Sequence, residues 1–138
     1  MNEIFLDSSY AIALASRTDE HHARATELAA WIETERISLV TTRAIMLEIG
    51  NALAKKRYRS VAVNLLEAIE RDAQIAVVPL SEDLYASAAT LYRKYADKEW
   101  GLTDCVSFIV MREKGLQEAL TADDDFRQAG FRALLLVD

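Results

Sequence analysis

The sequence predicts an α/β fold with a central parallel sheet of about five strands flanked by helices, in three layers. Short apolar runs alternate along the chain with longer amphipathic stretches, which is typical of βαβ units. The 138 residues suit one domain, and 51% hydrophobic with 28% charged residues exclude a disordered chain. We therefore expect a single domain spanning residues 1–138.

Each expected element has a local signal. Apolar and β-branched runs mark the strands, which are expected at residues 4–6, 37–40, 75–78, a short segment ending at 120–121, and 134–137. Apolar positions at helical spacing mark the helices, which are expected at about 10–14, 20–35, 42–56, 60–72, 81–95 and 103–111. Most of these helices follow Ser, Thr or Asp, which accept hydrogen bonds from free N–H groups at a helix start. Thr103 is expected to cap the last helix.

Charge and scarce residue types narrow the function classes. Sixteen Lys and Arg against 22 Asp and Glu give a net charge of −6. This charge argues against a protein that binds nucleic acid through its overall positive charge. It leaves open a nucleic-acid enzyme whose positive charge arrives with metal ions. The single cysteine, Cys105, excludes an internal disulfide framework and a cysteine-based zinc cluster.

No targeting or membrane segment is visible in the sequence. The first residues lack the basic region and the long apolar stretch of a signal peptide. No apolar run approaches the ~20 residues that cross a bilayer. We therefore expect a cytoplasmic protein without membrane association.

Four acidic residues fall where a carboxylate cluster would form. Asp7 and Asp123 follow the first and fourth expected strands, Asp104 lies in the first turn of a buried helix, and Glu48 lies on an apolar helix face. In parallel sheets, functional groups collect at the carboxyl ends of the strands. A helix cap or a turn is enough to explain each aspartate taken singly. It does not explain four acids at one edge of the sheet. Glu48 has no such explanation, because burying a lone carboxylate costs folding free energy.

Such a cluster needs cations. Two unit charges about 4 Å apart repel by ~4 kcal/mol at an effective dielectric of 20, so clustered carboxylates must spread out, hold protons or bind positive ions. Carboxylates without neighbouring His or Cys suit a hard divalent ion, Mg²⁺ or Mn²⁺.

Several short motifs occur in a characteristic order. They are Asp7-Ser8-Ser9, Glu48 with Asn51, Leu102-Thr103-Asp104-Cys105, Thr121-Ala122-Asp123 and the stretch at 126–131. Together they resemble a PIN domain, and most closely the VapC-like toxin ribonucleases of type II toxin–antitoxin pairs. Each motif alone is weak, whereas the ordered set is specific and spans nearly the whole chain.

The resemblance implies a PIN-like fold, Mg²⁺- or Mn²⁺-dependent endonucleolytic cleavage of single-stranded or loop RNA, a small antitoxin partner and a homodimer. By the same match, Asp7, Glu48, Asp104 and Asp123 carry the metal. Asp125 stands where many relatives have a basic or imidazole side chain. It could add a metal ligand or weaken phosphate contact.

Further residues have two interpretations each. Ser9, Asn51 and Thr103 could orient the carboxylates, or they could be caps and an ordinary polar helix residue. Arg43 and Lys55 are candidates for contacting RNA phosphates. The basic run 55–59, which includes Tyr58, could bind RNA or could favour a helix C-terminus. Trp100 could stack on a base or cover the core.

The sequence also bears on three other function classes. A haloacid-dehalogenase-type phosphatase needs a second Asp two residues after the first, but position 9 is Ser. A response-regulator receiver needs a phospho-acceptor Asp after the third strand, where Pro79 and Leu80 stand. A non-catalytic or housekeeping PIN-domain RNA-binding or interaction module remains the alternative to the ribonuclease.

Overall fold

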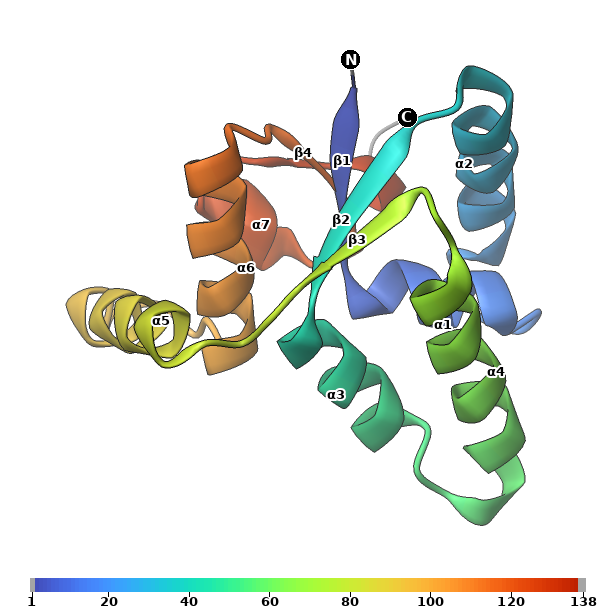
Figure 1. The fold of residues 1–138 in the computed structure, drawn as a ribbon, viewed down its shortest axis with the longest axis horizontal. Helices are drawn as coiled ribbons and strands as arrows, with labels where there is room; N and C mark the ends of the chain where they lie inside the picture. The colour runs from blue at the N-terminus through green and yellow to red at the C-terminus, as the bar shows by residue number, and fades with distance from the viewer. Residues whose placement is uncertain (1, 137–138) are drawn as a thin grey trace.

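A parallel sheet forms the centre of the computed structural model, which describes residues 2–136. Its strand order is β3-β2-β1-β4-β5 (Figure 1). The strands are β1 (Glu3–Leu6), β2 (Ser38–Thr42), β3 (Ile75–Val78), β4 (Glu118–Leu120) and β5 (Arg132–Ala133). The helices are α1 (Ser8–Ala15), α2 (His22–Glu35), α3 (Arg43–Ala52), α4 (Arg59–Arg71), α5 (Glu82–Lys94), α6 (Leu102–Lys114) and α7 (Asp124–Gln128), with 3-10 turns η1 (Lys56–Tyr58) and η2 (Leu134–Leu136). The predicted fold class is confirmed.

Helices cover both faces of the sheet. Helices α1, α2 and α4 lie on one side in Figure 1, and α6 and α7 lie on the other, with α5 packed outside α6. Helix α3 lies at the carboxyl edge of the sheet, where it contacts α1, α4 and α6. This edge is therefore surrounded by helix ends and by the turns that leave β1, β2 and β4.

An aromatic core holds the α6–α7 layer against the sheet. Phe5 of β1 lies 6.3 Å from Phe126 of α7, and Phe126 lies 5.0 Å from Phe108 of α6, between ring centroids. All three side chains are fully buried. The spacing of α6 and α7, and of the acids at their first turns, is therefore fixed by rigid ring packing.

Four predictions about the elements were wrong or incomplete. The fifth strand is not at 134–137: pairing starts at Arg132, because Gly130 (φ 97°) turns the chain sharply after α7. Residues 134–136 form η2, with two buried leucines, and residue 137 lies outside the described residues. Helix α3 ends at Ala52 rather than near 56. Gly101, not Thr103, is the N-cap of α6, and the short helix α7 was not predicted.

The described residues, 2–136, contain no helix that is both long enough and apolar enough to cross a membrane.

Candidate metal centre

Hydroxyl groups from two strand ends hold the side chain of Asp7. Ser9 Oγ donates to Asp7 Oδ2 at 2.9 Å, and Thr121 Oγ1 donates to the same oxygen at 2.7 Å. Ser9 Oγ also accepts from the Ala122 N–H at 3.0 Å. Asp7 occupies the N-cap position of α1, but its side chain makes no capping bond. The carboxylate is therefore tied across the ends of β1 and β4 instead of serving the helix.

Glu48 reaches the same edge from α3. Thr42 caps this helix by accepting from the Ile45 N–H at 3.1 Å, which sets the direction in which α3 leaves the sheet. Ser8 Oγ donates to Glu48 Oε1, so Glu48 is anchored to the residue that follows Asp7. The half-buried Glu48 carboxylate on an apolar helix face thereby gains a partner.

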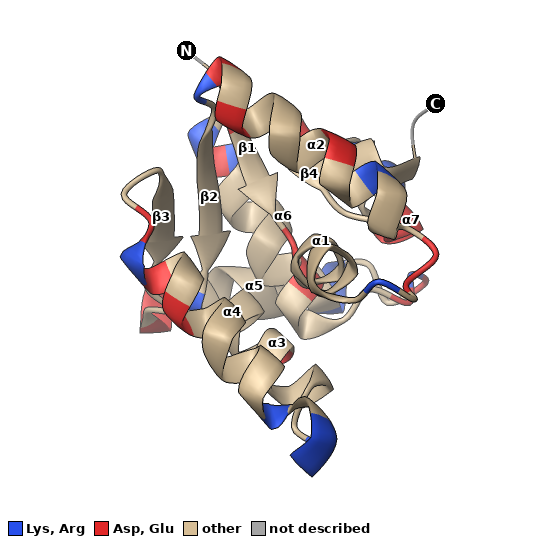
Figure 2. Cartoon of the chain, turned by 90° about the vertical axis from the view of Figure 1, so that its right-hand side faces the viewer, with Lys and Arg blue, Asp and Glu red and all other residues tan. Residues whose placement is uncertain are grey.

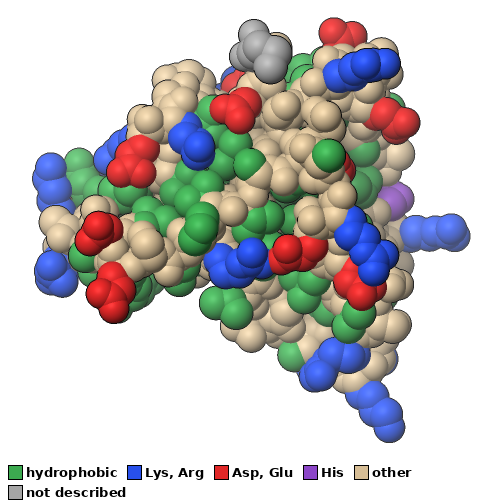
Figure 3. All heavy atoms as spheres, in the orientation of Figure 1, with side chains coloured by type: hydrophobic (Ala, Val, Ile, Leu, Met, Phe, Trp, Pro, Cys, Tyr) green, Lys and Arg blue, Asp and Glu red, His purple; other side chains and the backbone are tan. Residues whose placement is uncertain are grey.

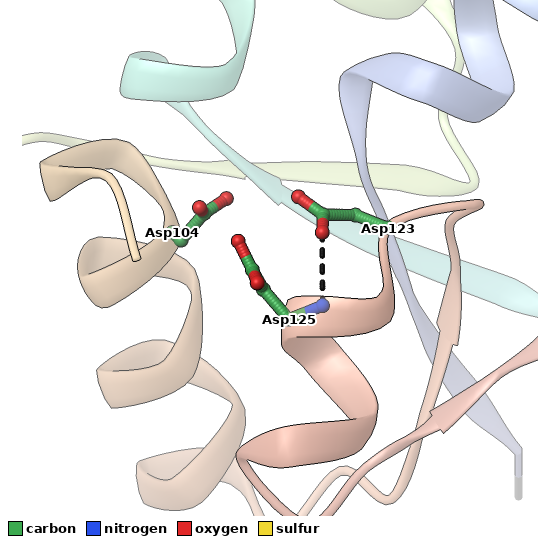
Figure 4. A group of neighbouring side chains, drawn as sticks. All are labelled: Asp104, Asp123 and Asp125. Atoms are coloured by element: carbon green, nitrogen blue, oxygen red, sulfur yellow. Dashed lines mark hydrogen bonds between the residues drawn. The ribbon is translucent and has the colours of Figure 1, made fainter. Parts of the chain in front are cut away.

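The remaining acids form a tight group (Figure 4). Asp104 lies in the first turn of α6, and Asp123 and Asp125 lie at the start of α7. One carboxylate oxygen from each lies within 4.8 Å of the others. The Gly101 N–H donates to Asp104 Oδ2 at 3.0 Å, and the Asp125 N–H donates to Asp123 Oδ1 at 2.9 Å.

The four predicted metal-binding acids share one arrangement. In Asp7, Glu48, Asp104 and Asp123, a hydrogen bond from a nearby hydroxyl or N–H fixes one carboxylate oxygen. Among the described residues, the second carboxylate oxygen of each accepts no side-chain or N–H hydrogen bond and can face another partner. Such carboxylates are oriented before any ligand arrives, which lowers the cost of binding a cation.

Burial and mutual repulsion raise the pKa values of three of these acids. Burial raises the pKa of Asp7 from 3.8 to about 6, against the lowering effect of the Thr121 and Ser9 hydroxyls. Burial, together with the charges of Asp123, Asp7 and Glu48, raises the pKa of Asp104 from 3.8 to about 7, although the hydrogen bond from Gly101 lowers it. Asp125 shows the same direction, through burial and then the charge of Asp123. The acids therefore act on one another electrically as one site.

The donor set fits a hard divalent cation. All the candidate ligand atoms are carboxylate oxygens, which Mg²⁺ and Mn²⁺ prefer. Opposite ligands of one Mg²⁺ lie about 4.2 Å apart, whereas the three aspartate oxygens lie within 4.8 Å of one another. Asp104, Asp123 and Asp125 would supply part of the ligand set of such an ion, and water molecules would supply the rest.

A family model described as the PIN domain matches residues 4–132. The chain belongs to the PIN domain family. The 23S rRNA-specific endonuclease VapC20 of Mycobacterium tuberculosis is 30% identical over 128 residues, which cover 93% of this chain and 95% of the relative. The crystal structure of that protein, described as a sarcin-ricin loop cleaving toxin, matches with a TM-score of 0.83 over the same shares of the two chains.

Two more distant structures share the fold. VapBC2 from Rickettsia felis, bound to a DNA fragment from its promoter, matches with a TM-score of 0.64 at 10% identity, covering 95% of this chain and 96% of the other. FitAcB from Neisseria gonorrhoeae matches with a TM-score of 0.59 at 20% identity, covering 94% of each chain.

The remaining residues that the sequence suggested for the site make no hydrogen bond to its acids among the described residues. Thr103 lies in the first turn of α6, and Asn51 is exposed at the end of α3; neither side chain donates to a carboxylate within residues 2–136. Arg43 pairs with Glu70 of α4, and Lys55 is exposed in the loop after α3. Trp100 is 6% exposed.

The rings around Trp100 decide between its two interpretations. The indole packs against Tyr95 and Phe108, each at 5.1 Å between centroids, so it covers the core and is not free to stack on a base.

Sequence reasoning assigned no role to Ser8 and Thr121, although both contact site acids. The available signal was position: Thr121 directly follows β4 and precedes Asp123 by two residues, and Ser8 directly follows Asp7 at the end of β1.

Proposed function

We propose that this PIN domain is an Mg²⁺- or Mn²⁺-dependent endoribonuclease, the toxin of a toxin–antitoxin pair that acts in the cytoplasm. The observation that carries the proposal is the set of four anchored carboxylates, joined by Asp125, at one edge of the sheet. Support comes from VapC20, the relative named as a 23S rRNA-specific endonuclease, because the similarity extends over 93% of the chain.

Asp104, Asp123 and Asp125 would hold the cation, each through one oxygen, and the free oxygens of Asp7 and Glu48 would contribute from the neighbouring elements. A bound divalent ion would offset the carboxylate repulsion, contact a phosphate oxygen and make a water molecule more acidic. Asp7 is the best candidate for the central ligand, because its side chain is 97% shielded from solvent and fixed by two hydroxyls.

The residues of the chain supply geometry for an in-line displacement. The anchored oxygens keep Asp7, Glu48, Asp104 and Asp123 in place, so little reorganisation is needed when the phosphate arrives. Water attack on phosphorus with departure of the 3′ oxygen gives 5′-phosphate and 3′-hydroxyl ends. The ribose 2′-hydroxyl takes no part in this reaction, so a single deoxynucleotide at the cleaved position should still be cut.

The same acids favour a cationic regulator. A guanidinium group binds carboxylates in bidentate fashion, so an antitoxin segment that carries Arg or Lys would compete with the metal at this edge. We infer a small partner whose disordered tail folds on binding, and we retain a homodimer as the assembly of the enzyme.

A cleavage assay tests the function. Asp7→Asn, Glu48→Gln and Asp104→Asn should each lower Mg²⁺- or Mn²⁺-dependent cleavage of a labelled stem-loop RNA by about 100-fold or more. Asp124→Asn is the matched control, because Asp124 is an exposed neighbour outside the acidic group, and it should cleave like the wild type.

Two outcomes would contradict the proposal. Cleavage that persists in EDTA, or products with 2′,3′-cyclic phosphate ends, would exclude the metal-dependent hydrolysis. RNA binding without cleavage under either ion would favour the non-catalytic PIN-domain module.

A further inference from the structure

We propose that the tip between α3 and α4 is a second contact surface for the RNA backbone, separate from the carboxylate site. We define this basic tip as Lys55, Lys56, Arg57, Tyr58 and Arg59. The proposal rests on the proposed ribonuclease function, and it adds where the enzyme holds RNA away from the bond that is cut.

The basic tip concentrates positive charge on an acidic protein. Its four cations are a quarter of the 16 Lys and Arg in a chain of net charge −6, and residues 51–66 contain no Asp or Glu. Figure 2 shows the basic residues at the far end of the α3–α4 hairpin, and Figure 3 shows basic side chains projecting from the same corner. Within residues 2–136, the ion pairs involve none of these four cations.

Helix electrostatics do not explain the basic tip. A cation stabilises the C-terminal end of a helix and destabilises the N-terminal end. Helix α3 ends at Ala52 with no basic residue in its last turn. Lys56 and Arg57 lie in η1, and Arg59 takes the first position of α4, where the dipole of that helix does not favour a cation. The dipoles of α3 and α4 therefore do not account for the basic tip.

The loop is built so that three of the cations remain free. Arg59 donates from Nε and Nη2 to the Ala54 carbonyl, at 3.2 and 2.6 Å, and so closes the loop. Lys55, Lys56 and Arg57 are exposed. The Arg57 guanidinium lies 4.8 Å from the centre of the Tyr58 ring, which is 39% exposed. An exposed aromatic ring among free cations suits a nucleic acid strand, with the ring under a base and the cations at phosphates.

The basic tip and the carboxylates are joined by one helix. Glu48 lies four residues before the end of α3, so helix rise and extended-chain length place the Cα atoms of Glu48 and Lys56 no more than about 20 Å apart. At 3.4 Å per nucleotide, this distance corresponds to about six nucleotides of a stacked strand. The acidic site repels a polyanion, whereas the basic tip attracts it. An RNA of this length or longer can therefore contact both.

Salt dependence of RNA binding tests the proposal. The probe is a 30-nucleotide single-stranded RNA, followed by fluorescence anisotropy in EDTA between 50 and 200 mM KCl. The test variant is Lys55→Gln/Lys56→Gln/Arg57→Gln, which spares Arg59. Each lost phosphate contact lowers the slope of log K against log salt by about 0.7. The fourfold salt increase should therefore weaken wild-type binding about 20-fold more than it weakens binding by the variant.

Arg17→Gln/Arg112→Gln/Lys114→Gln is the matched control. It removes the same charge from exposed residues away from the basic tip and should keep the wild-type slope. The melting temperature separates a structural role from a binding role: the tip variant should melt no lower than the wild type, because the three side chains that it changes are exposed. The control loses two cations from the last turn of α6 and should melt slightly lower.

RNA length supplies a second readout. In the presence of Mg²⁺, cleavage of a dinucleotide, which is too short to reach the basic tip from the carboxylates, should be equal for the wild type and the tip variant. KM for the 30-nucleotide RNA should rise in the tip variant alone.

Each contrary result would overturn the basic tip as an RNA surface. One such result is a tip variant with the wild-type salt slope, or a salt slope that falls equally in both triple variants. Another is a wild type that does not bind the RNA at all. A third is a tip variant that loses binding to phosphatidylserine vesicles but not to RNA. RNA binding is measured without metal, so it does not depend on cleavage. If the salt slopes of the wild type and the tip variant differ as expected but no RNA is cleaved, the nuclease activity is refuted and the basic tip stands.

Discussion

Replacing Asp7 by Asn should stabilise the metal-free protein at neutral pH, although it destroys the proposed site. Asp7 is 3% exposed, and its folded pKa is about 6 against an ordinary value of 3.8. Between these pH values the folded state holds a proton that the unfolded state has lost. Stability therefore falls as pH rises from 4 to 6, and above pH 6 the full cost of a buried, ionised carboxylate is present.

The size of the effect follows from the two pKa values. Their difference corresponds to about 3 kcal/mol, since each pKa unit is worth 1.36 kcal/mol. For a chain of 138 residues this free energy shifts the melting temperature by about 10 °C. Asn keeps an acceptor oxygen for the Ser9 and Thr121 hydroxyls, so the substitution removes charge with little change of shape.

Urea unfolding in EDTA at pH 4.5 and pH 8 measures the effect. The free energy of unfolding of Asp7→Asn minus that of the wild type should be more positive at pH 8 than at pH 4.5 by about 2 kcal/mol, because about 1 kcal/mol of the full cost is already present at pH 4.5. Asp124→Asn should show nearly the same difference at both pH values, because Asp124 is exposed. If the Asp7→Asn difference does not change with pH, or is more positive at pH 4.5, then Asp7 does not carry a raised pKa and the electrostatic account of the site is wrong.

Three further predictions concern the same acids. Mg²⁺ or Mn²⁺ should raise the melting temperature more at pH 7.5 than at pH 5, because protons occupy Asp7 and Asp104 at the lower pH; equal shifts in differential scanning fluorimetry would count against a clustered site. Thr121→Val removes a hydroxyl that lowers the Asp7 pKa, so the acid limb of the kcat/KM profile should move to higher pH, and an unmoved limb would exclude this positioning role. For the antitoxin, a co-expressed upstream gene product should bind Asp104→Asn more weakly than the wild type in a pulldown, and wild-type binding should weaken with Mg²⁺ beyond what matched ionic strength causes; equal capture would place the antitoxin contact elsewhere.

Sequence reasoning predicted the acids better than the residues around them. Asp7 and Asp123 follow strands, and a parallel sheet brings such strand ends to one edge. Glu48 and Asp104 lie in helices α3 and α6, and the sequence signals for them were an apolar helix face and the first turn of a buried helix. The supporting contacts were harder to predict. Asn51 has the helical spacing to touch Glu48, yet Ser8 makes the bond, because the approach of α1 to α3 depends on packing between helices that are distant in sequence.

Helix boundaries were missed where tertiary contacts override local preference. Thr103 is a better capping residue than Gly101, but α6 starts one residue before Thr103, and Asp104 accepts from the Gly101 N–H. The leucines at 134–136 form a 3-10 turn instead of a strand. There the Leu135 N–H donates to the Thr121 carbonyl at 3.2 Å, and this turn buries Leu134 and Leu135 in the core.

The sequence by itself determined the α/β class, the order of the first four strands and of the helices up to α6, and the positions of the acids, because hydrophobic periodicity and residue positions are local properties of the chain. Tertiary structure alone decided that Asp125 joins Asp104 and Asp123, that Thr121 and Ser8 hold Asp7 and Glu48, and that Arg43 pairs with Glu70. These outcomes depend on ångström-scale distances between elements far apart in sequence. Such distances are set by how α3, α6 and α7 pack around the sheet, and no local pattern encodes them.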